Sequence, residues 1–136
     1  MSNTEKTLSI IKPDAGERNL ENEIKVMFKS KGFQIVKEKK IQIAKSEAEQ
    51  FYKVHETKPF YNDLCTYLSS GPITVMVLEK ENAVLANREL MGATKPEEAA
   101  EGTIRKKYGI SIDKNSVHGS DSVENAKVEI EFFFKD

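Results

Sequence analysis

Cysteine and histidine are scarce in this 136-residue chain, and tryptophan is absent. The single cysteine, Cys65, excludes a disulfide within the chain and fits a reducing compartment, so we expect a cytoplasmic location. One cysteine and two histidines also form no clustered motif of the kind that binds zinc. No apolar run is long enough to cross a bilayer, and no secretory apolar segment follows the opening residues MSNTEK. Disulfide-rich, zinc-binding and membrane-spanning classes are therefore excluded.

An excess of charge of either sign is also missing. Lysine and arginine total 21, aspartate and glutamate total 22, and the net charge is −1. This balance argues against general affinity for nucleic acid or anionic membranes, so an anion site must come from locally clustered cations. The sequence contains no P-loop motif, no G-x-G-x-x-G motif and no G-x-S-x-G nucleophile elbow.

The chain does contain an alternation of strand and helix patterns. Its length fits one domain over residues 1–136, with 38% hydrophobic and 32% charged residues. Strands are predicted around residues 7–11, 33–43 and 73–78, with a short one leading to residue 118, and helices around 20–28, 46–55, 64–68, 82–90 and 123–134. Capping-box patterns at Ser46-x-x-Glu49 and Asp121-x-x-Glu124 mark two helix starts. This order of elements indicates the α+β class, with a sheet covered by helices.

The segment NSVHGSDSVE, residues 115–124, carries the first candidate for chemistry. Gly119 removes side-chain bulk beside His118, and a helix is predicted to begin just beyond. A histidine in that place lies near free backbone N–H groups and a partial positive charge, where it can receive or pass on phosphate. An ordinary surface turn is the alternative that this segment alone leaves open. The only other histidine, His55, is expected on the surface of a helix.

Two charged residues are the next candidates, each with an ordinary alternative. Lys12 follows the predicted strand Thr7–Ile11 and precedes a proline, so it lies at a strand end where a site could form, or it is a solvated lysine. Glu129 projects about 40° from Phe133 on the last predicted helix, on the flank of the apolar stripe. A carboxylate at a core boundary needs a partner. Spacing alone allows either a surface salt bridge or a contact back to His118.

Six blocks of sequence, in order, give the chain a specific resemblance. They are TLSIIKPD, KPFY, SGPITVMVLE, LMGATKP, GTIR and NSVHGSDSVE. On these blocks the chain resembles the nucleoside diphosphate kinases over essentially its whole length. The resemblance implies a ferredoxin-like βαββαβ sandwich, in which helices pack on a four-stranded antiparallel sheet. It also implies an enzyme that transfers the γ-phosphate of a nucleoside triphosphate, typically ATP, to a nucleoside diphosphate and so maintains nucleoside triphosphate pools.

The resemblance further implies a role for each residue of a site. His118 would be phosphorylated and would then phosphorylate the acceptor, in a ping-pong reaction with neutral imidazole as the nucleophile. Ser120 and Glu129 would orient the imidazole. The cations and hydrogen-bond donors around the phosphates would be Lys12, Tyr52, Arg88, Thr94 and Arg105. The base would lie between Phe60 and Ile112, with Asn115 at the sugar hydroxyl.

The implied cofactor is Mg²⁺ that arrives with the nucleotide phosphates, and Asp121 would reach it through water. No residue is assigned as a direct metal ligand. The implied partners are nucleoside triphosphates and diphosphates, without nucleic acid or membrane, together with further copies of the chain. Glu101-Gly102 stands where many relatives have proline and glycine. Because this position bears on subunit contacts, a tetramer and a hexamer both stay open.

Two interpretations from different classes remain. One is an active phosphotransferase, and the other is a silent nucleotide-binding or scaffolding relative. A silent relative would be expected to lack His118, Lys12 or one of the two arginines, and all are present, so the sequence favours the enzyme. Without the resemblance, Arg88 and Arg105 would be predicted to be solvated surface residues, and Phe60 a core residue.

Overall fold

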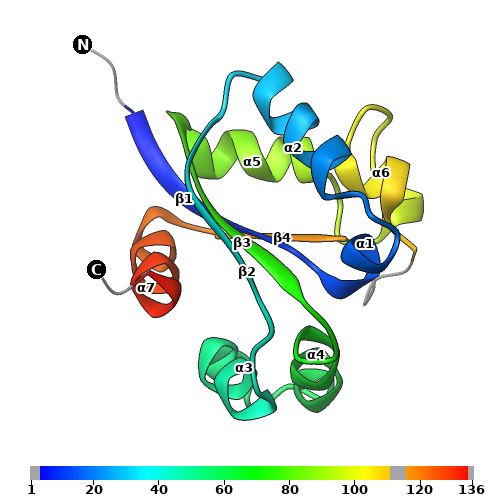
Figure 1. Cartoon of the computed structure of the whole chain (residues 1–136), viewed down its shortest axis with the longest axis vertical. Helices are drawn as coiled ribbons and strands as arrows, with labels where there is room; N and C mark the ends of the chain where they lie inside the picture. Colours follow the sequence, from blue (N-terminus) through cyan, green and yellow to red (C-terminus); the bar gives the residue numbers. More distant parts are fainter. Residues whose placement is uncertain (1–3, 111–115, 135–136) are drawn as a thin grey trace.

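A four-stranded antiparallel sheet forms the centre of the fold (Figure 1). The computed structural model describes residues 4–110 and 116–134. The strands are β1 (Thr4–Ile11), β2 (Gln34–Ile41), β3 (Ile73–Glu81) and β4 (Val117–Gly119), in the spatial order β2-β3-β1-β4. With the helices α2 (Glu21–Ser30) and α5 (Ala83–Met91) as connections, this is the βαββαβ topology of a ferredoxin-like sandwich. The predicted α+β fold is confirmed.

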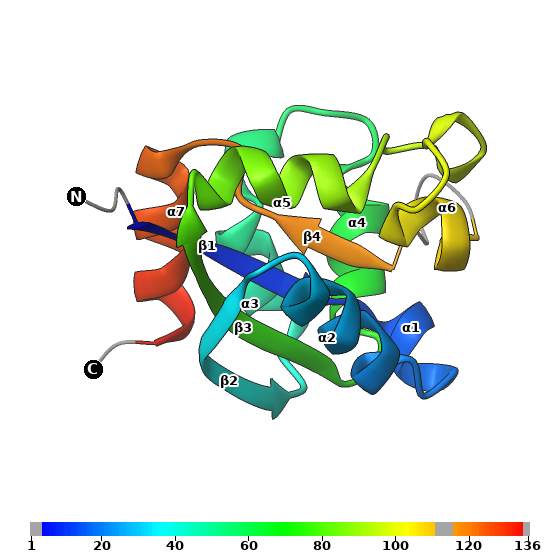
Figure 2. The ribbon, with the colours of Figure 1, turned by 90° about the horizontal axis from the view of Figure 1, so that it is seen from above.

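Helices cover both faces of the sheet, and each face has its own apolar core (Figure 1, Figure 2). On one face α2 and α5 cover a core that includes Ile11, Ile24, Phe28 and Leu78. The other face carries α3 (Lys45–Phe51), α4 (Tyr61–Leu68) and α7 (Val123–Phe133) over a core that includes Leu8, Ile10, Val75 and Phe133. Successive side chains of a strand point to opposite faces, so β1 and β3 supply both cores, as predicted for residues 73–78.

The start of α7 differs from the predicted capping box. Ser122 is the N-cap, and its Oγ accepts the N–H of Asn125 at 3.1 Å. The side chain of Asp121, the predicted cap, instead accepts from the side-chain amide of Asn125. Ser122 is one position nearer the first turn, so its hydroxyl is the group that reaches a free N–H of the helix. The prediction of Asp121 as the cap was therefore wrong.

The predicted helix over residues 46–55 is also different in the structure. The helix α3 begins at Lys45 and ends at Phe51, and residues Lys53–His55 form a separate 3₁₀ turn. Glu47 Oε1 accepts the N–H of Ala44 at 3.0 Å, which replaces the predicted pairing of Ser46 with Glu49. Tyr52, which directly follows α3, is buried in the core on this face of the sheet.

Two helices lack a counterpart in the sequence prediction. They are α1 (Pro13–Glu17) and α6 (Ile104–Tyr108), each too short for an apolar period to show. Their signals are local: Pro13 in the first turn of α1, and Thr103, whose Oγ1 accepts the N–H of Lys106 at 3.3 Å. Figure 2 shows both helices at the end of the sheet where β4 begins. Among the described residues, no helix is both long and apolar enough to cross a membrane.

Candidate active site

His118 lies in the middle of the edge strand β4, opposite Ile10 of β1. Opposed residues of paired strands project to the same face, and so do residues two apart along a strand. His118, Ile10 and Lys12 therefore leave the sheet on the same face, the one that carries α3 and α7. Lys12 directly follows β1, as predicted, and its backbone N–H donates to Ser116 O at 2.8 Å. Its side chain is buried, so the alternative of a solvated lysine is wrong.

Glu129 of α7 holds the imidazole of His118. Its Oε1 lies 3.1 Å from Nε2 of the histidine and accepts from Ser120 Oγ at 2.8 Å. Ser120 Oγ in turn accepts the backbone N–H of Leu8 at 3.3 Å, so hydrogen bonds run from β1 to the histidine. The side chains of His118 and Glu129 are 20% and 17% exposed. Of the two alternatives that helical spacing allows for Glu129, the structure shows the contact to His118.

Aromatic side chains also pack around the imidazole ring of His118. Phe51 and Tyr52 stand edge-on to the imidazole, with ring centroids 5.3 and 6.2 Å away. These rings, together with Glu129 and His55, line a small cavity of about 80 Å³ beside His118. The ring of His55 lies 6.3 Å from that of Tyr52 and is half-buried, so the expectation of a surface role for His55 was wrong.

Tyr52 offers a hydrogen-bond donor at this cavity. Its side chain is buried, and its Oη has no hydrogen-bond partner within residues 4–110 and 116–134. Burial, followed by the negative charge of Glu129, raises the pKa of Tyr52, so the phenol is neutral at physiological pH. A buried hydroxyl without a partner costs free energy. That cost is relieved when a ligand atom accepts from it.

A second cavity, of about 560 Å³, lies beside the first and contains two arginines. Its lining includes Arg88 of α5, Arg105 of α6 and Thr94 of the intervening loop. Gly119 and Asp121 line both cavities, so the guanidinium groups lie near the end of β4, the strand that carries His118. Three of the residues predicted to contact phosphate therefore gather at one place.

Arg105 is fixed in this second cavity by backbone carbonyls. Its Nη1 donates to Gly92 O at 3.0 Å, and its Nη2 donates to Val117 O, on β4, at 2.9 Å. Burial, followed by the positive charge of Arg88, lowers the pKa of Arg105 to about 10, so the guanidinium is still cationic at neutral pH. Arg105 is thus not a solvated surface arginine, whereas Arg88 is exposed but lines the cavity. Two cations side by side favour an anion between them.

The residues predicted to bind the nucleoside are only partly described. Phe60 is 46% exposed, which excludes a core position, and its ring lies 5.9 Å from that of His55. An exposed aromatic ring is suited to stacking on a nucleotide base. Ile112 and Asn115 lie outside the described residues.

Comparison with known proteins now identifies the family. The family model described as nucleoside diphosphate kinase matches residues 5–136. The chain belongs to the nucleoside diphosphate kinase family. The nucleoside diphosphate kinase of Campylobacter lari is 59% identical over 130 residues, which cover 96% of this chain and 95% of the relative. That of Persephonella marina is 57% identical over 130 residues, which cover 96% of this chain and 93% of the relative.

Solved structures of nucleoside diphosphate kinases have the same fold. That of Aquifex aeolicus matches with a TM-score of 0.95 at 42% identity, over 96% of this chain and 95% of that one. That of Encephalitozoon cuniculi matches with a TM-score of 0.94 at 38% identity, over 97% of this chain and 90% of that one. The predictions of a nucleoside diphosphate kinase, of its fold and of a phosphotransferase that uses nucleotides are confirmed.

Sequence reasoning missed several residues around this candidate site. Phe51 and His55 line the cavity of His118, but on a predicted helix they resemble core and surface residues. Asn87 of α5 is fully buried against Gly119. Asp14, two residues after Lys12, is 3% exposed. A lysine and an aspartate that flank a proline at a strand end were the available signal for Asp14.

Proposed function

We propose that the chain transfers the γ-phosphate of a nucleoside triphosphate to a nucleoside diphosphate through a phosphate carried on Nδ1 of His118. The observation that carries this proposal is the 3.1 Å contact between His118 Nε2 and Glu129 Oε1. A carboxylate at Nε2 favours the tautomer with the proton on that nitrogen. The lone pair of Nδ1 is then the one available for attack.

The proposed reaction has two displacements at phosphorus. In the first, Nδ1 of His118 attacks the γ-phosphorus, an N–P bond forms, and the P–O bond to the β-phosphate breaks, which releases the nucleoside diphosphate. The ring becomes cationic, and the carboxylate of Glu129 stabilises it through the proton that stays on Nε2. In the second, a β-phosphate oxygen of the acceptor attacks the phosphorus, and the electron pair of the N–P bond returns to Nδ1.

We assign the phosphates to the arginine cavity. Arg88, Arg105 and Thr94 line it, and Arg guanidinium groups suit phosphate oxygens. Lys12 leaves the sheet on the face of His118 and would act as a point charge near the transferred group. Tyr52 would donate from the small cavity, since its Oη has no partner among the described residues. Developing charge on the transferred group would thus meet donors already in place.

The nucleoside would be held mainly by stacking. Phe60 offers a half-exposed ring for one face of the base, and the resemblance to the family implies Ile112 for the other face and Asn115 for a sugar hydroxyl. Every base has a π-face, so this arrangement accepts different bases.

We also propose that Mg²⁺ is bound together with the nucleotide. Two carboxylates line the arginine cavity, those of Glu89 and Asp121, and of these only Asp121 also lines the cavity of His118. Mg²⁺ keeps several waters and is commonly held by one or two carboxylates and substrate phosphates, so Asp121 fits a contact through water. When bound, the ion would neutralise charge on the β- and γ-phosphates.

We further propose that residues 1–136 form one domain, that the protein is cytoplasmic, and that it assembles into a homo-oligomer, either a tetramer or a hexamer. Assembly is supported by apolar side chains that a single chain leaves exposed, among them Val26 at 62% and Val36, on the edge strand β2, at 43%. The buried free thiol of Cys65 fits a reducing compartment. Light scattering that gives the mass of one chain would contradict the proposed assembly.

A chiral, isotopically labelled γ-phosphate tests the two-step mechanism. In-line attack inverts phosphorus, so transfer through His118 inverts it twice and is expected to give net retention. Parallel double-reciprocal plots should accompany this, because one site holds donor and acceptor in turn. Direct transfer in one step would give net inversion, which would exclude a phosphohistidine intermediate.

Glu129→Gln is expected to lower kcat while nucleotide still binds. The amide keeps the shape and the bond to Ser120 but loses the charge that stabilises the phosphorylated imidazole. A loss of about 10–100-fold in kcat is expected, as for other supporting carboxylates, with the Kd for ADP within about twofold of wild type. Glu124→Gln, at an exposed site of the same helix, is the matched control. A lower unfolding free energy with unchanged kcat would make Glu129 a structural residue instead.

A further inference from the structure

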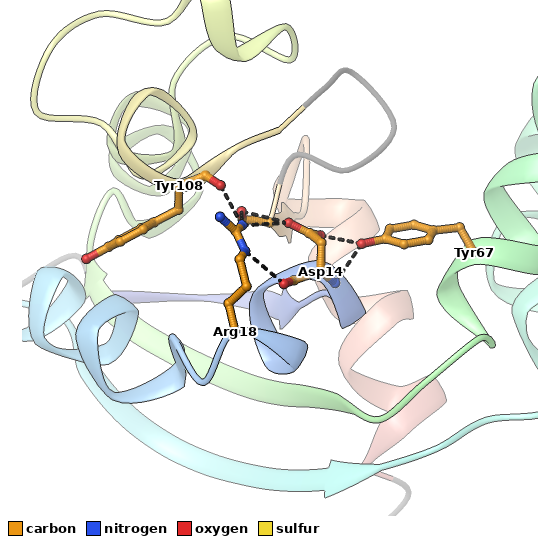
Figure 3. Close-up of polar contacts among 5 residues, drawn as sticks. Asp14, Arg18, Tyr67 and Tyr108 are labelled. Atoms are coloured by element: carbon orange, nitrogen blue, oxygen red, sulfur yellow. Dashed lines mark hydrogen bonds and ion pairs between the residues drawn. The ribbon is translucent and has the colours of Figure 1, made fainter.

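A buried acidic residue outside the proposed site is linked to three helices and to the residue that precedes strand β4. Asp14, in α1, accepts hydrogen bonds from three side chains (Figure 3). Tyr67 Oη of α4 donates to Oδ1, Ser116 Oγ donates to Oδ2 at 3.0 Å, and Arg18 Nη2 donates to Oδ2 at 3.2 Å. Arg18 also donates to the carbonyl of Tyr108, at the end of α6, at 2.6 Å. We call these five residues the Asp14 cluster.

The Asp14 cluster is held tightly because its carboxylate is buried. A carboxylate removed from water costs free energy unless it is paired and fully hydrogen-bonded, so its donors are kept in place. Burial, followed by the hydrogen bond to Asp14, raises the pKa of Tyr67, and its hydroxyl is therefore a neutral donor. The same hydroxyl accepts the backbone N–H of Asp14 at 2.7 Å. Tyr67 thus holds both the side chain and the backbone of Asp14.

The Asp14 cluster also holds Ser116 in an uncommon conformation. Ser116 is fully buried and has a φ of 74°, in the left-handed region that residues other than glycine rarely adopt. Its hydroxyl donates to Asp14, and its carbonyl accepts the N–H of Lys12. The strand β4 begins at the next residue. Such a conformation persists only where its surroundings determine it, and here they are Asp14 and Lys12.

Ser116 is linked to both Lys12 and His118, the two residues proposed to lie nearest to the transferred phosphate. Lys12 is two positions before Asp14, and His118 is two positions after Ser116. The bonds at Ser116 fix the start of β4 against the end of β1, so a shift there would move His118 relative to Lys12. We propose that Asp14 is a positioning residue for phosphoryl transfer, which holds the spacing between Lys12 and His118 through Ser116. This inference rests on the roles proposed above for Lys12 and His118.

Asp14→Asn tests this role. Asparagine keeps the volume, but its single side-chain oxygen cannot serve all three donors, and Arg18 loses its counter-charge. With saturating γ-labelled ATP, the rate of His118 phosphorylation is expected to fall about 10–100-fold, because a displacement of about 1 Å has effects of that order. The Kd for ADP should change by less than about threefold, since Arg88 and Phe60 are outside the cluster.

Two variants accompany Asp14→Asn. Glu38→Gln is the control. It removes the ion pair in which Glu38 Oε2 lies 2.5 Å from Lys25 Nζ, and Glu38 is on β2, at the sheet edge opposite β4. This variant is expected to keep the wild-type rate of phosphorylation. Tyr67→Phe removes one donor and leaves Asp14 charged, so it keeps the test open if Asp14→Asn does not fold. Its phosphorylation rate is expected to fall about threefold to tenfold, with the same unchanged Kd for ADP.

Substitutions at Ser116 separate positioning from stability. Ser116→Gly and Ser116→Ala both remove the hydroxyl that reaches Asp14, but only glycine adopts a positive φ without steric cost. If the conformation of Ser116 sets the spacing, Ser116→Gly should phosphorylate His118 at least about threefold faster than Ser116→Ala. Both rates are compared at a temperature where unfolding experiments show the variants fully folded.

The outcomes that overturn this inference differ from those that overturn the proposed function. Four results would each overturn the role of Asp14. The first two are a wild-type rate in Asp14→Asn and a loss of rate in Glu38→Gln equal to that in Asp14→Asn. The other two are equal rates in the two Ser116 variants and a Kd for ADP that rises as far as the rate falls. Label on a residue other than His118 in the wild-type protein would overturn the proposed function itself, whatever the rate of Asp14→Asn.

Discussion

His118→Ala is expected to abolish phosphoryl transfer while ADP still binds. The substitution removes Nδ1, the proposed attacking atom, and leaves Glu129 and Ser120 hydrogen-bonded to each other. Loss of a nucleophile that acts with its partners lowers kcat by about 10⁴-fold or more. Because we assign nucleotide binding to the arginine cavity and Phe60, the Kd for ADP should stay within about threefold of wild type. Steady-state kinetics and calorimetric titration with ADP measure the two quantities separately.

Labelling with γ-labelled ATP is the control for His118→Ala. The variant should take up no label, whereas His55→Ala should still carry label on His118, even though His55 lines the same cavity. Circular dichroism shows whether each variant is folded before the rates are compared. More than a trace of label on the His118→Ala variant would show that another residue is the nucleophile.

Gly119→Ala is expected to lower both stability and kcat, because β4 and α5 touch at this glycine. A Cβ there would lie 2.3 Å from Asn87 Nδ2 and 2.7 Å from Met91 Cε. Overpacking of this kind costs about 1–3 kcal/mol. At roughly 4 °C per kcal/mol, Tm would fall by roughly 4–12 °C. The residue next to His118 must move away from α5, so kcat should fall by about 10²-fold, and thermal unfolding and kinetics measure the two effects.

Two further variants test the cause of that loss. Asn87→Ala removes the nearest obstructing group, so combining it with Gly119→Ala should restore part of the lost Tm and kcat. Gly71→Ala is the matched control, because its Cβ would lie 3.5 Å from Pro13 Cβ, an ordinary contact, and its Tm should stay within about 1 °C of wild type. A wild-type Tm in Gly119→Ala would show that α5 gives way without cost.

Elements with a long apolar period were predictable from the chain alone. The strand β3 and the helix α2 bury continuous or regularly spaced apolar side chains, and both lie where the pattern predicts them. The helices α1 and α6 have five residues each, so no period could show, and only local signals such as Pro13 and the Thr103 cap mark them. Helix starts were harder still, because neighbouring polar residues such as Asp121 and Ser122 are both good caps, and backbone geometry selects one.

The candidate site was also only partly predictable from the sequence. The segment around His118 and the other sequence blocks were enough to predict the family and its phosphotransferase function, since they occur together in order. The spacing of α7 placed Glu129 on the flank of an apolar stripe but allowed two partners. The structure selects His118, because β4 and α7 meet there. The assignments of Ile112 and Asn115 stay predictions, since both lie outside the described residues.

By itself, the sequence determined the types of the longer elements, their apolar faces and a histidine shortly before the last helix, although His118 lies within β4 and not at its end. These features depend on interactions between residues a few positions apart, which spacing records. The tertiary structure alone decided that Arg88 and Arg105 share a cavity, that Tyr52 lies beside His118, and that Asp14 holds Ser116 across 102 residues of chain. Those contacts follow from the strand order and from which helices cover each face, and no local pattern in the chain contains that information.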